Sequence, residues 1–115
     1  MTPAELRRCC LGLAGAEEGF PFGQVTCVFK VAGRIFALSA LDQEPLAVSL
    51  KCEPALAEDL RASHAAIVPG YHLNKRHWIT VTLDGSLDDA MVRDLVEDSY
   101  DLVVGGLPRR VREGL

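Results

Sequence analysis

Two stretches rich in β-branched and aromatic residues flank a short glycine turn, and this pattern constrains the fold more than any other feature. The stretches are QVTCVFKV (24–31) and RIFALSAL (34–41), joined by Ala32-Gly33. Such runs around a short turn predict a β-hairpin. After the turn DQEP, the run LAVSLK (46–51) predicts a third antiparallel strand. Its apolar and polar positions are mixed, which indicates a sheet covered on one face.

Three segments carry helix signals. At the N-terminus, Thr2 and Glu5 match a capping box, and this helix should end at the glycines of LGLAG. A second helix is predicted to begin at Pro54 and to run through ALAEDLRASH. A third is predicted from a capping sequence at Ser86 to about Val104, because two glycines follow. Helices therefore precede, interrupt and follow the strands.

A second hairpin is predicted where IVPGYHL (67–73) and HWITVTL (77–83) flank Asn74-Lys75-Arg76, with the alternative that Asn74 begins a short helical turn. The segment EEGFPFG before the first hairpin is interpreted as a loop. The resulting fold class is α+β, an antiparallel sheet of about five strands with helices packed on one face. No linker, repeat or low-complexity tract interrupts residues 1–115, so one domain is expected.

Composition narrows the compartment and the chemistry. The chain has 115 residues and a formal charge of −4, which argues against a protein that coats nucleic acid over its whole surface. No apolar run approaches the roughly 18–20 residues that cross a bilayer, so we expect a cytoplasmic protein without a membrane partner. The four cysteines form no CxxC pair and are expected to be buried and reduced; they are Cys9, Cys10, Cys27 and Cys52.

Several segments resemble a known family over nearly the whole chain. They are FPFG (20–23), VFKVAGRIFAL (28–38), LAVSLK (46–51), HLNKRHWITVTLDGS (72–86) and SYDLVVGGLP (99–108). Together they resemble the MmcQ/YjbR family, and HLNKRHW is the most specific of them. The resemblance implies a frataxin-like, CyaY-like fold. It also implies DNA binding, because the hairpins of the family are described as a double wing.

The stretch HLNKRHW is the main candidate site. No Asp or Glu occurs from residue 60 to residue 83, where all three histidines and the only tryptophan gather. Here cations would meet phosphates, polar side chains would donate hydrogen bonds, and an aromatic ring would stack on an unpaired base. The residues are Lys75 and Arg76 for phosphate, His72, Asn74 and His77 for hydrogen bonds, and Trp78 for stacking. Arg109, Arg110 and Arg112 near the C-terminus would extend the contact.

Alternation along the last strand bears on this site. If residues 77–83 form a strand, Ile79 and Val81 lie on the core face with His77 at its edge, and Trp78 lies on the opposite face. An outward tryptophan beside basic residues favours a binding role. Two alternatives remain at this point: a hairpin that serves only folding, with Trp78 as a core anchor, and a pocket for a small ligand or another protein.

Other kinds of site have weaker support. The histidines lie eight and five residues apart, which matches no compact zinc or iron motif, so no metal is predicted. A stripe of carboxylates at helical spacing is interpreted as a solvated face, with a site for a hard cation as the alternative; it comprises Asp94, Glu97, Asp98 and Asp101. No nucleophile elbow, P-loop or dinucleotide fingerprint occurs, so we expect a non-enzyme without a cofactor.

Overall fold

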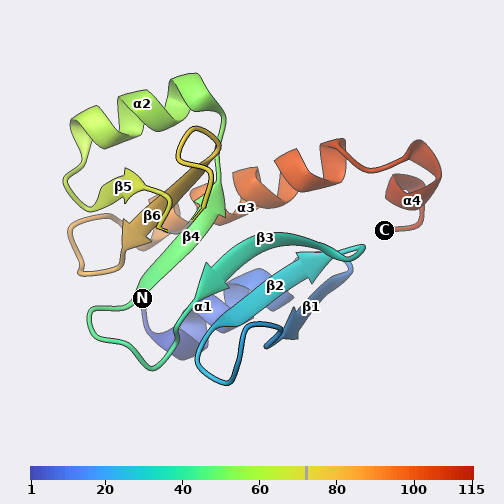
Figure 1. The fold of residues 1–115 in the computed structure, drawn as a ribbon, viewed down its shortest axis with the longest axis horizontal. Coiled ribbons are helices and arrows are strands. Elements are labelled where there is room, and N and C mark those ends of the chain that lie inside the picture. Colours follow the sequence, from blue (N-terminus) through green and yellow to red (C-terminus); the bar gives the residue numbers. More distant parts are fainter. Residues whose placement is uncertain (72) are drawn as a thin grey trace.

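The computed structural model describes residues 1–71 and 73–115 and contains a six-stranded antiparallel sheet with the strand order β1-β2-β3-β4-β6-β5 (Figure 1). The strands are β1 (Ala16–Gly19), β2 (Cys27–Val31), β3 (Arg34–Ser39), β4 (Ala47–Lys51), β5 (Ile67–Pro69) and β6 (Trp78–Thr82). The helices are α1 (Pro3–Leu11), α2 (Pro54–Ser63), α3 (Asp89–Gly105) and α4 (Arg109–Glu113). The predicted α+β class is confirmed.

Helices cover one face of this sheet. In Figure 1, α1 and α3 lie behind the strands, and α3 contacts β2, β3 and β4. The second helix, α2, packs against β5 at one edge, and α4 follows the C-terminal end of α3. We call the face opposite α1 and α3 the open face. Within the described residues, no helix crosses it in Figure 1.

Register explains which side chains form the core. Val48 and Leu50 of β4 stand opposite Val81 and Ile79 of β6, and all four are fully buried. Strand residues alternate between faces, so the intervening pairs point to the open face. The Oγ atoms of Ser49 and Thr80 confirm this, because they meet at 2.8 Å. The predicted alternation along β6 is therefore confirmed.

One buried hydroxyl connects α3 to the sheet where β3 and β4 separate. These strands share only the pairs Ala37–Leu50 and Leu38–Ser49. Just beyond them, Ser99 Oγ accepts a hydrogen bond from the Lys51 backbone N–H at 2.8 Å and donates one to the Phe36 carbonyl at 2.7 Å. Because Ser99 is fully buried, its hydroxyl satisfies two backbone groups that lack a ladder partner there.

The predicted count of about five strands is one too low. The segment interpreted as a loop contains all of β1 except Ala16, and β1 pairs with β2 from Ala16–Val31 to Gly19–Val28. Glu17 and Glu18 are exposed, so β1 has no apolar alternation to reveal it. It forms because the β2 backbone offers hydrogen bonds, which do not depend on side-chain type.

The start of α1 agrees with the prediction from the sequence, whereas the start of α3 does not. The capping box of α1 is present: the Glu5 N–H donates to Thr2 Oγ1 at 3.1 Å, and the Thr2 N–H donates to Glu5 Oε1 at 3.2 Å. The third helix begins at Asp89 rather than at Ser86. Both the N–H and the hydroxyl of Ser86 donate to Asp84 Oδ1, which holds the chain in a turn before the helix.

The four cysteines are free thiols. Cys10, Cys27 and Cys52 are buried as expected, whereas Cys9 is half-buried. Burial raises the pKa of the Cys10 thiol to about 12, so this side chain stays protonated and behaves as a small apolar residue. Among the helices of the described chain, none is long and apolar enough to cross a membrane.

Candidate functional site

The second predicted hairpin is present, but its connection is longer and more structured than a tight turn. β5 and β6 pair antiparallel, and residues 70–77 join them. Asn74 Oδ1 accepts hydrogen bonds from the backbone N–H groups of Arg76 at 2.9 Å and His77 at 3.3 Å. The Trp78 N–H donates to the Asn74 carbonyl at 3.0 Å, so Asn74 begins a helical turn. Its side-chain oxygen is thereby engaged within the loop.

Gly70 anchors this loop on the sheet. Its N–H donates to the Trp78 carbonyl at 2.9 Å, and a Cβ at this position would lie 2.6 Å from the Trp78 Cβ, so the contact requires glycine. The next N–H, from Tyr71, donates to Thr80 Oγ1 at 3.0 Å. Lys75 Nζ lies 3.5 Å from the Gly70 carbonyl oxygen. The loop is therefore held against the sheet instead of projecting freely.

Two lysines and two aromatic residues are brought near one another here by strand register and by contacts to the backbone. Trp78 is half-buried and pairs in register with Lys51, on the side of the sheet that Ser49 and Thr80 also face. The ring of Tyr71 follows Gly70 and is 71% exposed, and the amine of Lys75 lies beside Gly70. We call Lys51, Tyr71, Lys75 and Trp78 the open-face cluster. Their side chains combine positive charge with flat apolar surface.

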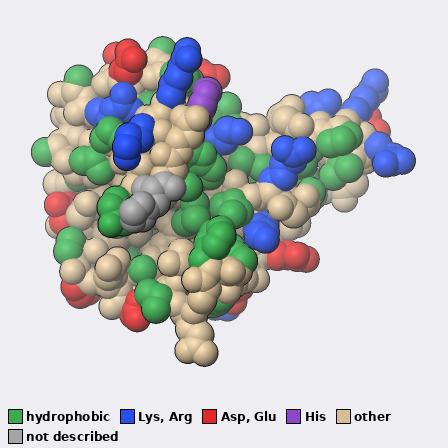
Figure 2. All heavy atoms as spheres, viewed as in Figure 1, with side chains coloured by type: hydrophobic (Ala, Val, Ile, Leu, Met, Phe, Trp, Pro, Cys, Tyr) green, Lys and Arg blue, Asp and Glu red, His purple; other side chains and the backbone are tan. Residues whose placement is uncertain are grey.

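Charge is distributed unevenly between the two faces. Figure 2, which looks onto the open face, shows Lys and Arg side chains spread over its upper half and towards α4, with most Asp and Glu side chains along the rim. The acidic stripe lies on α3, in the helical layer. There, burial raises the pKa of the Asp98 carboxyl, with further contributions from the neighbouring charges of Asp101 and Asp94. The stripe therefore disfavours an anion at that part of α3, whereas the upper half of the open face carries Lys and Arg side chains.

The structure brings most of the predicted site residues together. Asn74, Lys75, Arg76, His77 and Trp78 all lie in or directly after the loop, and Lys75, Arg76 and His77 are exposed. His72 lies outside the described residues.

The predicted arginines of α4 are separate from this loop. Figure 1 shows α4 at the far end of α3, away from the β5–β6 connection. Arg109 Nε also donates to Glu113 Oε1 at 2.8 Å. Arg109 and Arg110 therefore do not join the open-face cluster. Sequence reasoning also missed Lys51 and Tyr71, although the alternation of LAVSLK already places Lys51 on the face opposite Leu50.

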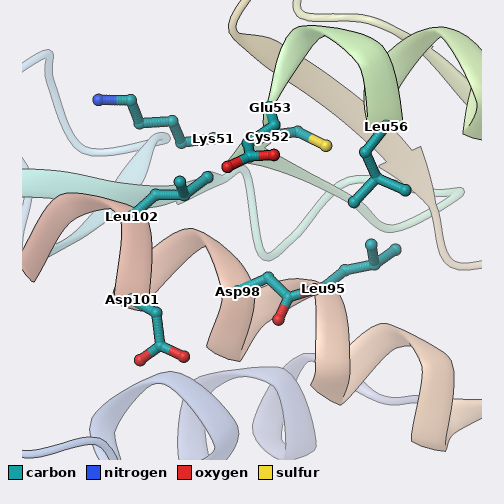
Figure 3. A pocket seen from close by; sticks show the side chains of 8 residues that line it. All are labelled: Lys51, Cys52, Glu53, Leu56, Leu95, Asp98, Asp101 and Leu102. Carbon is teal, nitrogen blue, oxygen red and sulfur yellow. The ribbon is translucent and has the colours of Figure 1, made fainter. Parts of the chain in front are cut away.

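A cavity of about 340 Å³ lies elsewhere, between the end of β4, the start of α2 and the middle of α3 (Figure 3). It is lined by Lys51, Cys52, Glu53, Leu56, Leu95, Asp98, Asp101 and Leu102. In Figure 3 the Lys51 amine points away from the other lining side chains. The remaining charges are carboxylates, so this cavity does not suit a phosphate. Across residues 1–71 and 73–115, no group of three or more His, Cys, Asp or Glu side chains is arranged to hold a metal ion.

Comparison with known proteins gives a consistent set of relatives. A family model described as YjbR matches residues 11–102. The uncharacterized protein YjbR of Escherichia coli K12 is 42% identical over 113 residues, covering 98% of this chain and 96% of that protein. The uncharacterized protein YbdF of Escherichia coli O157:H7 is 39% identical over 104 residues, covering 90% and 85%.

Solved structures agree with these relatives. The crystal structure of Deinococcus radiodurans protein DR2400, described as a DUF419 domain, superposes with a TM-score of 0.93 at 43% identity, covering 98% of this chain and 86% of that chain. A crystal structure of a Pseudomonas syringae protein superposes with a TM-score of 0.76 at 27% identity, covering 89% and 98%. The sheet and its helices are thus shared with experimentally determined folds.

Proposed function

This chain belongs to the YjbR family, and the name of that family states no activity. From the geometry of the candidate site, we propose that the protein is a non-enzymatic nucleic-acid-binding module. The observation that carries this proposal is the open-face cluster. It joins cations to a half-buried tryptophan on a face that no helix of the described chain covers. Phosphates need cationic donors and bases need flat apolar surfaces, and this cluster offers both.

The mechanism is electrostatic attraction followed by local contact. Lys51, Lys75 and Arg76 would bind phosphate oxygens, and the exposed imidazole of His77 would donate a further hydrogen bond. The carboxylates of α3 lie in the helical layer, so they would repel a phosphate backbone that approached from that side. The protein would therefore bind nucleic acid in one orientation, with the open face towards the ligand.

The number of cations sets the expected salt dependence. Three phosphate contacts predict a plot of log affinity against log salt with a slope of about −2 to −3, because each contact contributes roughly 0.7 for single strands and 0.9 for duplexes. On a chain with net charge −4, binding should be detectable at low salt and weak near physiological salt.

The test is a titration of labelled oligonucleotides, followed by fluorescence anisotropy at several salt concentrations. We expect the double variant Lys75→Ala/Arg76→Ala to bind more weakly and to reduce the steepness of the salt slope by about one to two. The matched control is Arg8→Ala/Arg93→Ala, which removes the same charge from residues that line a different cavity, between α1 and α3. Absence of binding at tens of micromolar protein in low salt, or equal losses in both double variants, would contradict the proposal.

The same surface favours a second candidate, a site for one small aromatic anion. Trp78 and Lys51 alone provide a ring and a charge at adjacent positions of β6 and β4. Such a site would bind a mononucleotide as tightly as an oligonucleotide, whereas the favoured function predicts affinity that rises with oligonucleotide length. Titration of AMP and of oligothymidylates of increasing length distinguishes the two.

A further inference from the structure

We propose that the ligand of the open face is single-stranded nucleic acid, with bases stacked on Trp78 and Tyr71, rather than a duplex gripped by a projecting hairpin. This inference rests on the proposed function and narrows its ligand class. It follows from how the 70–77 loop is held, from the kinds of side chain in the open-face cluster, and from the spacing of the strands beneath it.

The loop geometry disfavours insertion into a duplex groove. A wing that follows a groove must extend from the body of the protein, but this loop is attached to the sheet at two points and is closed on itself at a third. The Gly70 N–H bonds to the Trp78 carbonyl, the Tyr71 N–H bonds to Thr80 Oγ1, and Lys75 Nζ lies 3.5 Å from the Gly70 carbonyl. The space at Gly70 is too small for a Cβ, so the start of the loop lies in close contact with Trp78. The basic residues therefore lie on a surface and not on an arm.

The aromatic residues favour unpaired bases. In a duplex the faces of the bases are stacked on one another, so an aromatic side chain reaches them only in single strands, loops or ends. Tyr71 is 71% exposed, and Trp78 is half-buried with its position fixed by Gly70 on one side and by the pair with Lys51 on the other. The two residues therefore differ in how much of their surface is exposed. Both suit stacking without sequence preference, because every base has a π face.

Strand spacing places charge beside each ring. Adjacent strands lie about 4.8 Å apart, so the side chain of Lys51 on β4 starts next to Trp78 on β6. A base on Trp78 would have its phosphate within reach of the Lys51 amine, and a base on Tyr71 would have Lys75 nearby through Gly70. The open-face cluster thus provides two positions that each combine a ring with a cation.

The chain supplies its own reporter for this inference, because Trp78 is its only tryptophan. We would titrate the protein with three probes of equal length: oligothymidylate, a mixed-sequence duplex, and an abasic oligonucleotide that keeps the phosphates but lacks the bases. We would record the fluorescence emission of Trp78 and, separately, the fluorescence anisotropy of each labelled probe. Stacking on the indole quenches its emission, whereas phosphate binding alone changes anisotropy without that quenching.

The expected result is oligothymidylate binding at least ten times tighter than duplex, with quenching of Trp78 that the abasic probe does not produce. Tyr71→Ala should weaken oligothymidylate binding by about ten-fold and leave abasic binding unchanged. Because Tyr71 is largely exposed, this variant tests stacking without disturbing the core. The matched control is Phe22→Ala, which removes an aromatic ring from a residue that is 67% exposed. Phe22 lies in the β1–β2 connection, near the opposite edge of the sheet from β5.

Other outcomes separate the inference from the function on which it rests. Duplex binding as tight as oligothymidylate binding, or equal losses in Tyr71→Ala and Phe22→Ala, would overturn the single-strand inference while leaving nucleic-acid binding intact. Binding of the abasic probe as tight as that of oligothymidylate would also overturn it. Binding of none of the three probes at tens of micromolar in low salt would overturn the proposed function together with the inference.

Discussion

Removal of the Ser99 hydroxyl should be among the most damaging conservative changes in this protein. In Ser99→Ala, the Lys51 N–H and the Phe36 carbonyl both lose their partner, at the place where β3 and β4 separate. The site is fully buried, so solvent does not replace the bonds. The substitution removes a single oxygen atom, and its effect therefore reports hydrogen bonding and not packing.

The size of the effect follows from the two orphaned groups. Each buried backbone group left unpaired costs about 1–3 kcal/mol, which gives a loss of about 2–4 kcal/mol after allowance for partial relaxation. This is a large share of the roughly 5–15 kcal/mol that keeps a domain folded. With about 2.1 cal/mol/K of unfolding entropy per residue, a chain of 115 residues should lose about 8–16 °C in Tm.

Urea unfolding followed by circular dichroism and by Trp78 fluorescence measures this loss. The control is Ser63→Ala at the exposed end of α2, which should change the free energy of unfolding by less than about 0.5 kcal/mol. A loss below about 1 kcal/mol in Ser99→Ala, indistinguishable from the control, would refute the view that this hydroxyl completes the sheet.

Three further outcomes are expected. Thr2→Ala should cost about 1 kcal/mol in urea unfolding, because it removes the capping box of α1; no loss would mean that the cap frays in solution. Asp98→Asn should stabilise the protein at pH 7, because the folded state raises the pKa of this carboxyl and so penalises its charge. That gain should vanish as the pH falls below about 3.9, the ordinary Asp value, and a gain that persists there would contradict the assignment. Gly70→Ala should destabilise the protein and shift the emission of Trp78, unlike Gly19→Ala, where a Cβ meets nothing within 4 Å.

The sequence predicted the features of the fold that depend on residues close to one another along the chain. The capping box of α1 was readable because both of its partners lie within four residues of each other. The faces of β6 were readable because a strand alternates with a period of two, which correctly placed Ile79 in the core and Trp78 on the opposite face. The same rule applied to LAVSLK would have found Lys51.

Features that depend on distant partners were not readable. β1 is polar and exposed, and only the backbone of β2 makes it a strand. The bridge through Ser99 joins residues 48 and 63 positions away in the sequence, so no local pattern announces it. The attachment of the 70–77 loop to the sheet depends in the same way on Trp78 and Thr80. The sequence therefore predicted a hairpin with a basic tip and did not predict these hydrogen bonds.

The two outer strands of the sheet also affect how the protein behaves when many copies crowd together. A strand edge with free N–H and C=O groups invites a strand of another molecule to add to it, which is a route to aggregation. Here β5 is three residues long and ends in Pro69, which has no N–H to offer. At the other edge, β1 is four residues long and carries the exposed charge of Glu17, while the carboxylate of Glu18 is paired with Arg7. Short strands, a proline and a charged side chain at the two margins of the sheet therefore disfavour polymerisation, although no helix of the described chain crosses the open face.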